Sequence, residues 1–364
     1  MRSAPSSNRC EPPPTTSACR APSCSTPRRP SCTTPPPASS PPSSWSPRTR
    51  GASAAHFAAA ERARRLAQAW DLACERPAAP LAAPGEPAPV LAESLDGPAF
   101  AAAAARTREW IAAGDTYQVN LSTRLELPAP ADPLRAYEAV RATNPSPYMG
   151  FLRLPGVTVV CGSPELLVEA AGARLVSRPI AGTRPRTGAA ADDDAFSREL
   201  AADSKERAEH LMLVDLLRND LGRVSRPGTV RVPEFMAIER YSHVMHLVSQ
   251  VEGERAPGAG PAEVVRALFP GGTVTGAPKV RTMQVIAELE PVARGFYTGS
   301  IGWVGASGDL ALNIVIRTLT CVGGRCFAQA GAGVVADSVP EREHAESLRK
   351  ALALRVALGR VSAR

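Results

Sequence analysis

Apolar side chains recur at helical spacing in several stretches of the chain. A repeat near 3.6 residues predicts an amphipathic helix that turns one face toward a core. We therefore expect helices over residues 54–76, 98–113, 195–219, 261–268, 277–289 and 341–358. Residues 77–90, rich in proline, alanine and glycine, predict a linker behind the first helix.

Shorter apolar runs predict strands between these helices. Residues 117–127 alternate, with Tyr117, Val119 and Leu121 on one side, and so predict a strand with one buried face. Further strands are expected over residues 148–154, 157–161, 166–170, 174–177, 229–239, 243–252, 299–304, 310–320 and 325–329. The polar residues 184–194 indicate a mobile loop. Together these elements predict an α+β fold with large mixed sheets.

The first 50 residues differ in composition from the rest of the chain. They contain 13 of the 36 prolines and no valine, isoleucine or leucine. Such a segment cannot bury enough apolar surface to offset the entropy of ordering, so we predict that residues 1–50 form a disordered tail. The mixture of serine, proline, arginine, threonine and cysteine is also typical of GC-rich DNA translated out of frame. We therefore interpret the tail as a frameshift or mis-start product.

The net charge of +7 comes almost entirely from this tail, which has seven arginines against Glu11 alone. Residues 51–364 carry 35 basic and 34 acidic side chains, a balance that argues against nucleic acid as a partner. No apolar run approaches the roughly 18 residues that a membrane span requires, and no signal or transit peptide pattern fits the start of the chain. We expect a cytoplasmic protein with no membrane partner.

Four of the eight cysteines lie outside the tail, at Cys74, Cys161, Cys321 and Cys326. Their spacing fits neither a disulfide framework nor a tetrahedral metal site. We interpret them as free thiols in a reducing compartment.

Two pairs of glutamates repeat one spacing on predicted helices. Glu206 and Glu209 lie on the helix over 195–219, and Glu343 and Glu346 lie on the last helix. Residues three apart share a helix face, and convergent carboxylates are ligands that Mg²⁺ prefers. A solvated, salt-bridged helix face is the alternative, because arginines stand three or four residues away.

Ten segments, taken in order, resemble the chorismate-utilising enzymes. They span about residues 105–360 and read GDTYQVNLSTR, NPSPYMGF, GSPELLVE, RPIAGTRPR, ERAEHLMLVDLLRNDLGRV, YSHVMHLVSQVEG, FPGGTVTGAPKVRTMQVIAELEP, YTGSIGWVG, NIVIRTLT and AGAGVVADSVPEREHAESLRKA. Within that family the chain is similar to component I of aminodeoxychorismate synthase or of anthranilate synthase. The resemblance implies a chorismate substrate and a fold of two large mixed β-sheets, sandwiched, with flanking helices.

The resemblance also implies roles for single residues. The four glutamates would hold Mg²⁺ on the ring carboxylate of chorismate. Thr273 and Thr275 would lie near the reacting face of the ring, and His246 would assist departure of the C4 hydroxyl as an acid or hydrogen-bond donor. The groups implied in binding substrate carboxylates are Tyr297, Arg317, Lys350 and the backbone of Gly331, Ala332 and Gly333.

Two positions bear on the nucleophile and on the carbon that it attacks. Relatives that add water keep a lysine base where this chain has Gln118, whose amide cannot take up a proton, so the resemblance favours ammonia. The segments YQVNL, FPGGTVTGAPK and YTGSIGW resemble the aminodeoxychorismate branch, whereas Ala181 replaces the lysine that forms a covalent adduct at C2 in that branch. We favour aminodeoxychorismate synthase component I and keep anthranilate synthase component I as the alternative.

The resemblance leaves the N-terminal region short, because component I proteins carry a long further segment before the YQVNL strand. We expect a truncated N-terminal part, with residues 51–104 a remnant and linker and residues 105–364 the chorismate-binding catalytic domain. A truncated, inactive chorismate-binding remnant is the non-enzymatic alternative. No glutaminase signature is present, so we expect ammonia from a separate glutamine amidotransferase subunit and, for 4-aminobenzoate and folate synthesis, a separate lyase.

Overall fold

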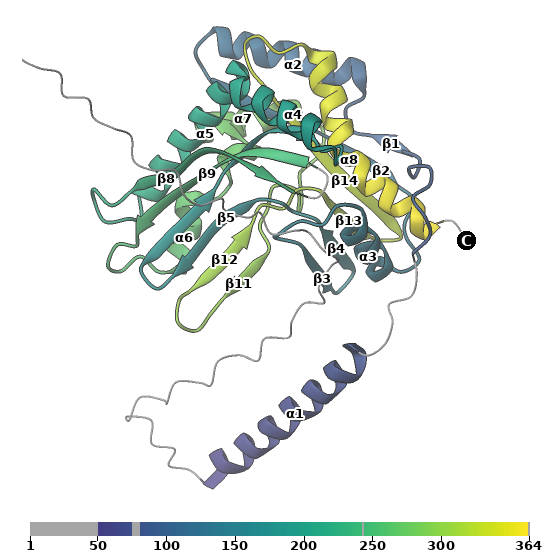
Figure 1. The fold of residues 1–364 in the computed structure, drawn as a ribbon, viewed down its shortest axis with the longest axis vertical. Helices are drawn as coiled ribbons and strands as arrows, with labels where there is room; N and C mark the ends of the chain where they lie inside the picture. Colours follow the sequence, from purple (N-terminus) through teal and green to yellow (C-terminus); the bar gives the residue numbers. More distant parts are fainter. Residues whose placement is uncertain (1–49, 75–80, 242–243, 363–364) are drawn as a thin grey trace, which may run out of the picture. The chain divides into compact units, whose positions relative to one another are not determined.

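The computed structural model describes residues 50–74, 81–241 and 244–362 (Figure 1). The chain divides into two units, residues 1–78 and residues 79–364. In the first unit the described part is one helix, α1 (Arg50–Cys74), as the sequence predicts, and it exposes Leu66 and Trp70. The predicted disordered tail lies, except for Arg50, outside the described residues. Among the described helices, none has both the length and the apolar character needed to cross a bilayer.

The described residues of the second unit form two β-sheets of seven strands each. The first sheet has the order β1 (Ala92–Glu93), β2 (Gln118–Leu127), β14 (Arg325–Val334), β13 (Thr318–Val322), β4 (Val157–Cys161) and β3 (Gly150–Leu154), with β10 (Gly276–Ala277) also paired to β2. The second has the order β11 (Gly302–Val304), β12 (Leu310–Asn313), β5 (Leu166–Ala171), β6 (Arg174–Arg178), β9 (Val244–Glu254) and β7 (Ile180–Pro185), with β8 (Arg231–Arg240) also paired to β9.

The predicted α+β fold with two large sheets is confirmed, but the strand pairing is not mixed. Every described strand pair is antiparallel. Several neighbouring strands are consecutive in sequence and joined by tight turns, as in β3–β4, β5–β6 and β13–β14. Such short connections permit only antiparallel neighbours, since a parallel pair needs a long crossover.

Helices flank both sheets. They are α2 (Gly97–Ala112), α3 (Pro133–Thr143), α4 (Ala190–Ala202), α5 (Ser204–Gly222), α6 (Pro261–Leu268), α7 (Lys279–Leu289) and α8 (Pro340–Ser362), with a 3₁₀ turn at Gly272–Val274. Helix α8 lies along β14 and contacts α2 and α3, whereas α5 contacts β9 and β7 of the second sheet. In Figure 1 the yellow α8 follows the first sheet, and α4 and α5 lie over the second.

The chain crosses between the sheets at two places that lie side by side. One crossing, residues 162–165, leads from β4 to β5, and the other, residues 314–317, leads from β12 to β13. Backbone hydrogen bonds tie them together, from Gly162 N to Arg317 O (3.0 Å) and from Ile314 N to Glu165 O (3.1 Å). The single strand predicted over residues 310–320 is therefore wrong. The first part of this apolar run forms β12 in the second sheet, and the last part begins β13 in the first sheet. The positive φ of Arg317 (48°) turns the chain between the two strands.

The predicted helix over 195–219 and the mobile loop before it also need correction. The structure has two helices, α4 and α5, and α4 begins inside the predicted loop. The break comes at Asp203, whose side chain accepts hydrogen bonds from the backbone N–H groups of Lys205 and Glu206 and so caps α5. Asp193 in the first turn of α4 accepts from Arg186 Nε (2.9 Å) and Thr187 N (3.0 Å), which orders the segment.

Strand β2 is buried on both faces, so the prediction of one buried face is wrong. Its apolar positions pack against helices, as Leu121 does with Phe100 of α2. Its alternate positions, Gln118, Asn120 and Ser122, are polar and at most 6% exposed. A polar face closed to water places hydrogen-bonding groups in the interior of the unit.

Candidate functional site

Three of the predicted glutamates come together at the polar face of β2. Gln118 Nε2 donates a hydrogen bond of 2.7 Å to Glu209 Oε1 on α5. Burial raises the pKa of Glu206 and of Glu209, and the carboxylate of Glu346 on α8 raises both further. The two helices therefore bring Glu206, Glu209 and Glu346 within mutual electrostatic range.

Glu343 and Glu346 also contact lysines and a serine. Glu343 is buried and accepts a hydrogen bond from Ser338 Oγ (2.9 Å), with Lys205 Nζ at 3.6 Å. Glu346 lies 2.8 Å from Lys350 Nζ. Burial opposes ionisation of Glu346, but the positive charges led by Lys350 outweigh it and hold its pKa below the usual range.

The chemistry of these carboxylates fits a hard cation. Among the described residues, however, no group of three or more His, Cys, Asp or Glu side chains is arranged as a preformed metal site. Glu206 and Glu209 repel each other and Glu346 in a buried setting, which a divalent cation would relieve. Magnesium at this cluster stays a prediction.

His246 and Ala181 lie beside the cluster, on β9 and β7. Gly182, next to Ala181, has a φ of 58°, and a Cβ there would lie 2.6 Å from Leu200 Cδ1 and 3.1 Å from Glu206 Oε2, so only glycine fits. His246 Nδ1 is 3.1 Å from Gly182 O and 3.1 Å from Thr183 Oγ1. Burial, with a smaller effect of Arg317, lowers the pKa of His246 to about 4. The ring is therefore neutral near pH 7, which suits a hydrogen-bonding role better than an acid.

Glu165 is a functional candidate that the sequence analysis did not single out. It lies in the crossing from β4 to β5 and is 5% exposed. Burial raises its pKa to about 7, although the Thr273 hydroxyl and, less strongly, Arg317 and Lys350 act in the opposite direction. A carboxyl group whose pKa lies near 7 is partly protonated at neutral pH and is suited to general acid catalysis. Its position in GSPE, directly between two buried strands, is the signal that could have identified it.

The predicted threonines differ in what their hydroxyls do. Thr275 Oγ1 donates to Gly271 O (2.8 Å), and Thr275 O accepts from Asn120 N (2.7 Å), so Thr275 ties its loop to β2. Thr273 Oγ1 is buried beside the Glu165 carboxyl and lowers the pKa of that carboxyl. The Thr273 hydroxyl therefore interacts with Glu165, whereas the Thr275 hydroxyl is tied to the backbone.

The remaining predicted binding residues surround the same polar interior. Lys350 Nζ donates to Gly331 O (3.0 Å). A Cβ at Gly333 would lie 2.2 Å from Gln118 Nε2, so the glycine leaves space for that amide. Tyr297 is buried, and burial raises the pKa of its phenol, which stays a hydrogen-bond donor. Ala332, between the two glycines, points to the opposite, apolar face of β14, where it pairs in register with Leu121.

Arg294 holds several of these segments in place. Its guanidinium donates to Val274 O (2.8 Å) and Asn120 O (2.6 Å) and pairs with Glu290 (2.6 Å). It also lies over the ring of Tyr297, 5.5 Å from the centroid. This half-buried arginine therefore connects β2, the loop of Thr273 and Tyr297.

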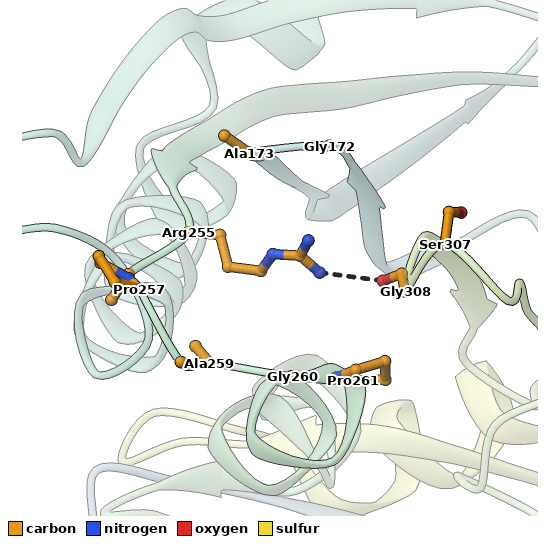
Figure 2. A pocket seen from close by; sticks show the side chains of 11 residues that line it. Gly172, Ala173, Arg255, Pro257, Ala259, Gly260, Pro261, Ser307 and Gly308 are labelled. Atoms are coloured by element: carbon orange, nitrogen blue, oxygen red, sulfur yellow. Dashed lines mark hydrogen bonds between the residues drawn. The ribbon is translucent and has the colours of Figure 1, made fainter. Parts of the chain in front are cut away.

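A separate pocket, with a volume of about 490 Å³, lies where turns of the second sheet meet the start of α6; Figure 2 shows the side chains that line it. It is lined by Gly172, Ser307 and residues 255–261, and Arg255 Nη1 donates to Gly308 O across it (2.9 Å). None of the predicted site residues lines this cavity.

Comparison with known proteins places this chain among chorismate enzymes. The family model for chorismate binding enzyme matches residues 47–355. The chain is 56% identical over 259 residues to aminodeoxychorismate synthase component 1 of Bacillus subtilis, covering 71% of this chain and 55% of that protein. It is 54% identical over 265 residues to anthranilate synthase component 1 of Streptomyces coelicolor, covering 72% of this chain and 52% of that protein.

Solved structures agree with these matches. The fold is similar to the crystal structure of anthranilate synthase component I from Streptococcus pneumoniae, with a TM-score of 0.72 and 35% identity, covering 80% of this chain and 65% of that one. The chain spans about half the length of the curated relatives it matches. On the extent of the family match, the chain belongs to the chorismate binding enzyme family.

Proposed function

We propose that this chain carries the reaction centre of a component I enzyme that aminates chorismate, in the manner of aminodeoxychorismate synthase. The observation that carries the proposal is the hydrogen bond from Gln118 Nε2 to Glu209 Oε1 (2.7 Å). It places a neutral amide at the carboxylate cluster, where addition of water would need a base. Ammonia is a nucleophile without such a base.

The residues around the polar interior divide the chemistry between them. Chorismate carries two carboxylates, and Arg317, Lys350 and the phenol of Tyr297 are donors suited to them. The C4 hydroxyl must leave as water and needs a proton, which Glu165 can donate near neutral pH because burial raises its pKa to about 7. Neutral His246 would orient the substrate by hydrogen bonding.

Magnesium belongs to the proposal as the cation that the carboxylate cluster suits. Glu206, Glu209 and Glu346, with Glu343 beside them, would hold it. When bound, it would neutralise the ring carboxylate of chorismate.

Anthranilate synthase component I is the second candidate, and one observation favours it. Ala181 lies buried beside Gly182 and has no nucleophilic atom, so an adduct at C2 cannot form there. Ammonia attack at C2 would then lead to anthranilate from the same site. The two relatives, at 56% and 54% identity, do not separate these reactions.

One assay separates the candidates. The purified chain would be incubated with chorismate, magnesium and ammonium salt at mildly alkaline pH, with an aminodeoxychorismate lyase added to one half. We expect 4-aminobenzoate only in the half with lyase. Fluorescent anthranilate in both halves would establish the second candidate, and no turnover by folded protein would establish an inactive chorismate-binding remnant. In the cell we expect a separate glutamine amidotransferase subunit to supply the ammonia.

A further inference from the structure

Cys321 and Cys326 face each other across the hairpin of β13 and β14. The register pairs them directly, and their Sγ atoms lie 3.5 Å apart. The turn between the strands is Gly323–Gly324, with φ values of 57° and 75°, which a tight two-residue hairpin turn requires. The turn fixes the register and therefore fixes the pairing of the two thiols.

The position of the two cysteines in the hairpin suits a disulfide bond between the strands. Val322 and Arg325 flank the turn and form its closing pair, so Cys321 and Cys326 form the next, non-hydrogen-bonded pair. Cα atoms in such pairs lie about 4.5 Å apart, within the range of about 4.4–6.8 Å found for disulfides. A bond between the two sulfurs needs only side-chain rotation and a small approach of the strands.

The two thiols differ in access and in acidity. Cys326 is fully buried in the core beneath α8, whereas Cys321 is half-buried. The hydrogen bond between them lowers the pKa of Cys321, and the same contact together with burial raises the pKa of Cys326. Cys321 is therefore the more accessible and the more acidic of the two thiols, and a reagent in solution reaches it first.

We propose that Cys321 and Cys326 form a reversible disulfide when the chain meets a low-molecular-weight disulfide. The Cys321 thiolate attacks one sulfur of the reagent, forms a mixed disulfide and releases one thiolate. Cys326 loses its proton and attacks Cys321 Sγ, which forms the cross-strand bond and releases the second thiolate. Two protein thiols are oxidised and one disulfide reagent is reduced to two thiols, so atoms and electrons balance.

Peptide mapping tests the proposal without any measurement of enzyme activity. Trypsin cuts after Arg317, Arg325 and Arg342, so the two cysteines fall in separate peptides, 318–325 and 326–342. Folded full-length chain treated with oxidised glutathione, blocked and digested without reductant should yield these peptides linked as one species. Dithiothreitol before digestion should release both.

Matched variants identify the pair. Cys161 is a buried thiol on the adjacent strand β4 whose pKa burial raises, so Cys161→Ser should keep the linked species. Cys321→Ser should abolish it, and Cys326→Ala should accumulate glutathione on peptide 318–325. Closure of the mixed disulfide should be roughly tenfold or more faster in folded chain than in urea, because the hairpin holds the sulfurs together.

Three results would overturn the proposal. The first is recovery of both peptides as free thiols from folded, oxidised chain. The second is stable glutathione on both cysteines without linkage. The third is linkage of either cysteine mainly to a different one. Because Cys321 is only half-buried, Cys321→Ser is the decisive variant if Cys326→Ala does not fold, with circular dichroism as the check.

Discussion

The two faces of strands β2 and β14 are both buried, yet they differ in what they contact. On one face, Leu125 and Ala328 pack in a core with α3 and α8. On the other, Gln118, Asn120 and Gln329 point into the polar interior, and within the described chain Gln118 Oε1 and Gln329 Oε1 are buried without a hydrogen-bond partner. An unpartnered buried polar atom costs about 1–3 kcal/mol. The apolar face therefore stabilises the fold, while the polar face gives up stability, as expected for the surface that we propose binds the substrate.

The largest expected effect is on the polar face, at the carboxylate cluster. Glu209→Gln keeps the shape of the side chain and removes one charge. If the cluster holds magnesium, turnover should fall by roughly a thousandfold or more, since the cation contributes several kcal/mol. Thermal stability should stay equal or rise, because repulsion with Glu206 and Glu346 is relieved.

The solvent-facing Glu341→Gln, on the same helix as Glu346, is the matched control for Glu209→Gln and should leave turnover unchanged. Near-normal turnover of Glu209→Gln at low magnesium would remove this carboxylate from the site.

Glu165→Gln should change turnover and stability in opposite directions, because the same buried carboxyl group donates a proton and is costly to ionise. Because glutamine has no acidic proton to donate, kcat of the variant should fall by about 10²–10⁴-fold. In the wild type, kcat/KM should fall as pH rises above about 7, because Glu165 then loses its proton.

The stability of Glu165→Gln should change in the opposite sense. Because the folded-state pKa of about 7 lies above the usual 4.5, the wild type loses stability as pH rises between these values. The variant has no such loss. At pH 8 its free energy of unfolding should therefore exceed that of the wild type by about 1–3 kcal/mol, and near pH 4 the two proteins should be equally stable. A urea titration at both pH values measures this, and equal stability at pH 8 would contradict the raised pKa.

Leu121→Ala tests the apolar face. Leu121 is fully buried against Phe100 and Val334, so truncation leaves a cavity and should lower the free energy of unfolding by about 2–5 kcal/mol. Val322→Ala, on the same sheet but exposed, should cost much less. Comparable losses for the two variants in chemical denaturation would show that this face is not the stabilising one.

The smallest expected effect is a change of product. Gln118→Lys places an amine beside Glu209, where water-adding relatives keep a lysine. If burial lowers the pKa of that lysine toward neutrality, a fraction of chorismate should be hydroxylated to isochorismate. Chromatography with mass detection measures the product ratio, and Gln118→Met, similar in length but without a base, is the control. An unchanged ratio in folded Gln118→Lys would mean that the side chain does not reach the ring.

Much of this protein follows from its sequence. Helical periodicity predicts α1, α2, α6, α7 and α8, and the glutamate spacing predicts a shared carboxylate face, because side chains three residues apart on a helix must point the same way. Segment order is enough to recognise the family. These features depend on residues that are neighbours along the chain or on one helix.

Only the tertiary structure showed which sheet each strand joins and which polar side chains are buried. The run over residues 310–320 reads as one strand, but its two halves belong to different sheets, because burial on either sheet demands the same apolar residues. The alternation along β2 predicts that Gln118 and Asn120 face solvent, but elements distant in the sequence bury both side chains. The pKa of about 7 at Glu165 arises from burial at the crossing of two segments about 150 residues apart. The hydrophobic pattern determined which apolar residues form the core, and only packing determined which polar groups are buried and which of them meet.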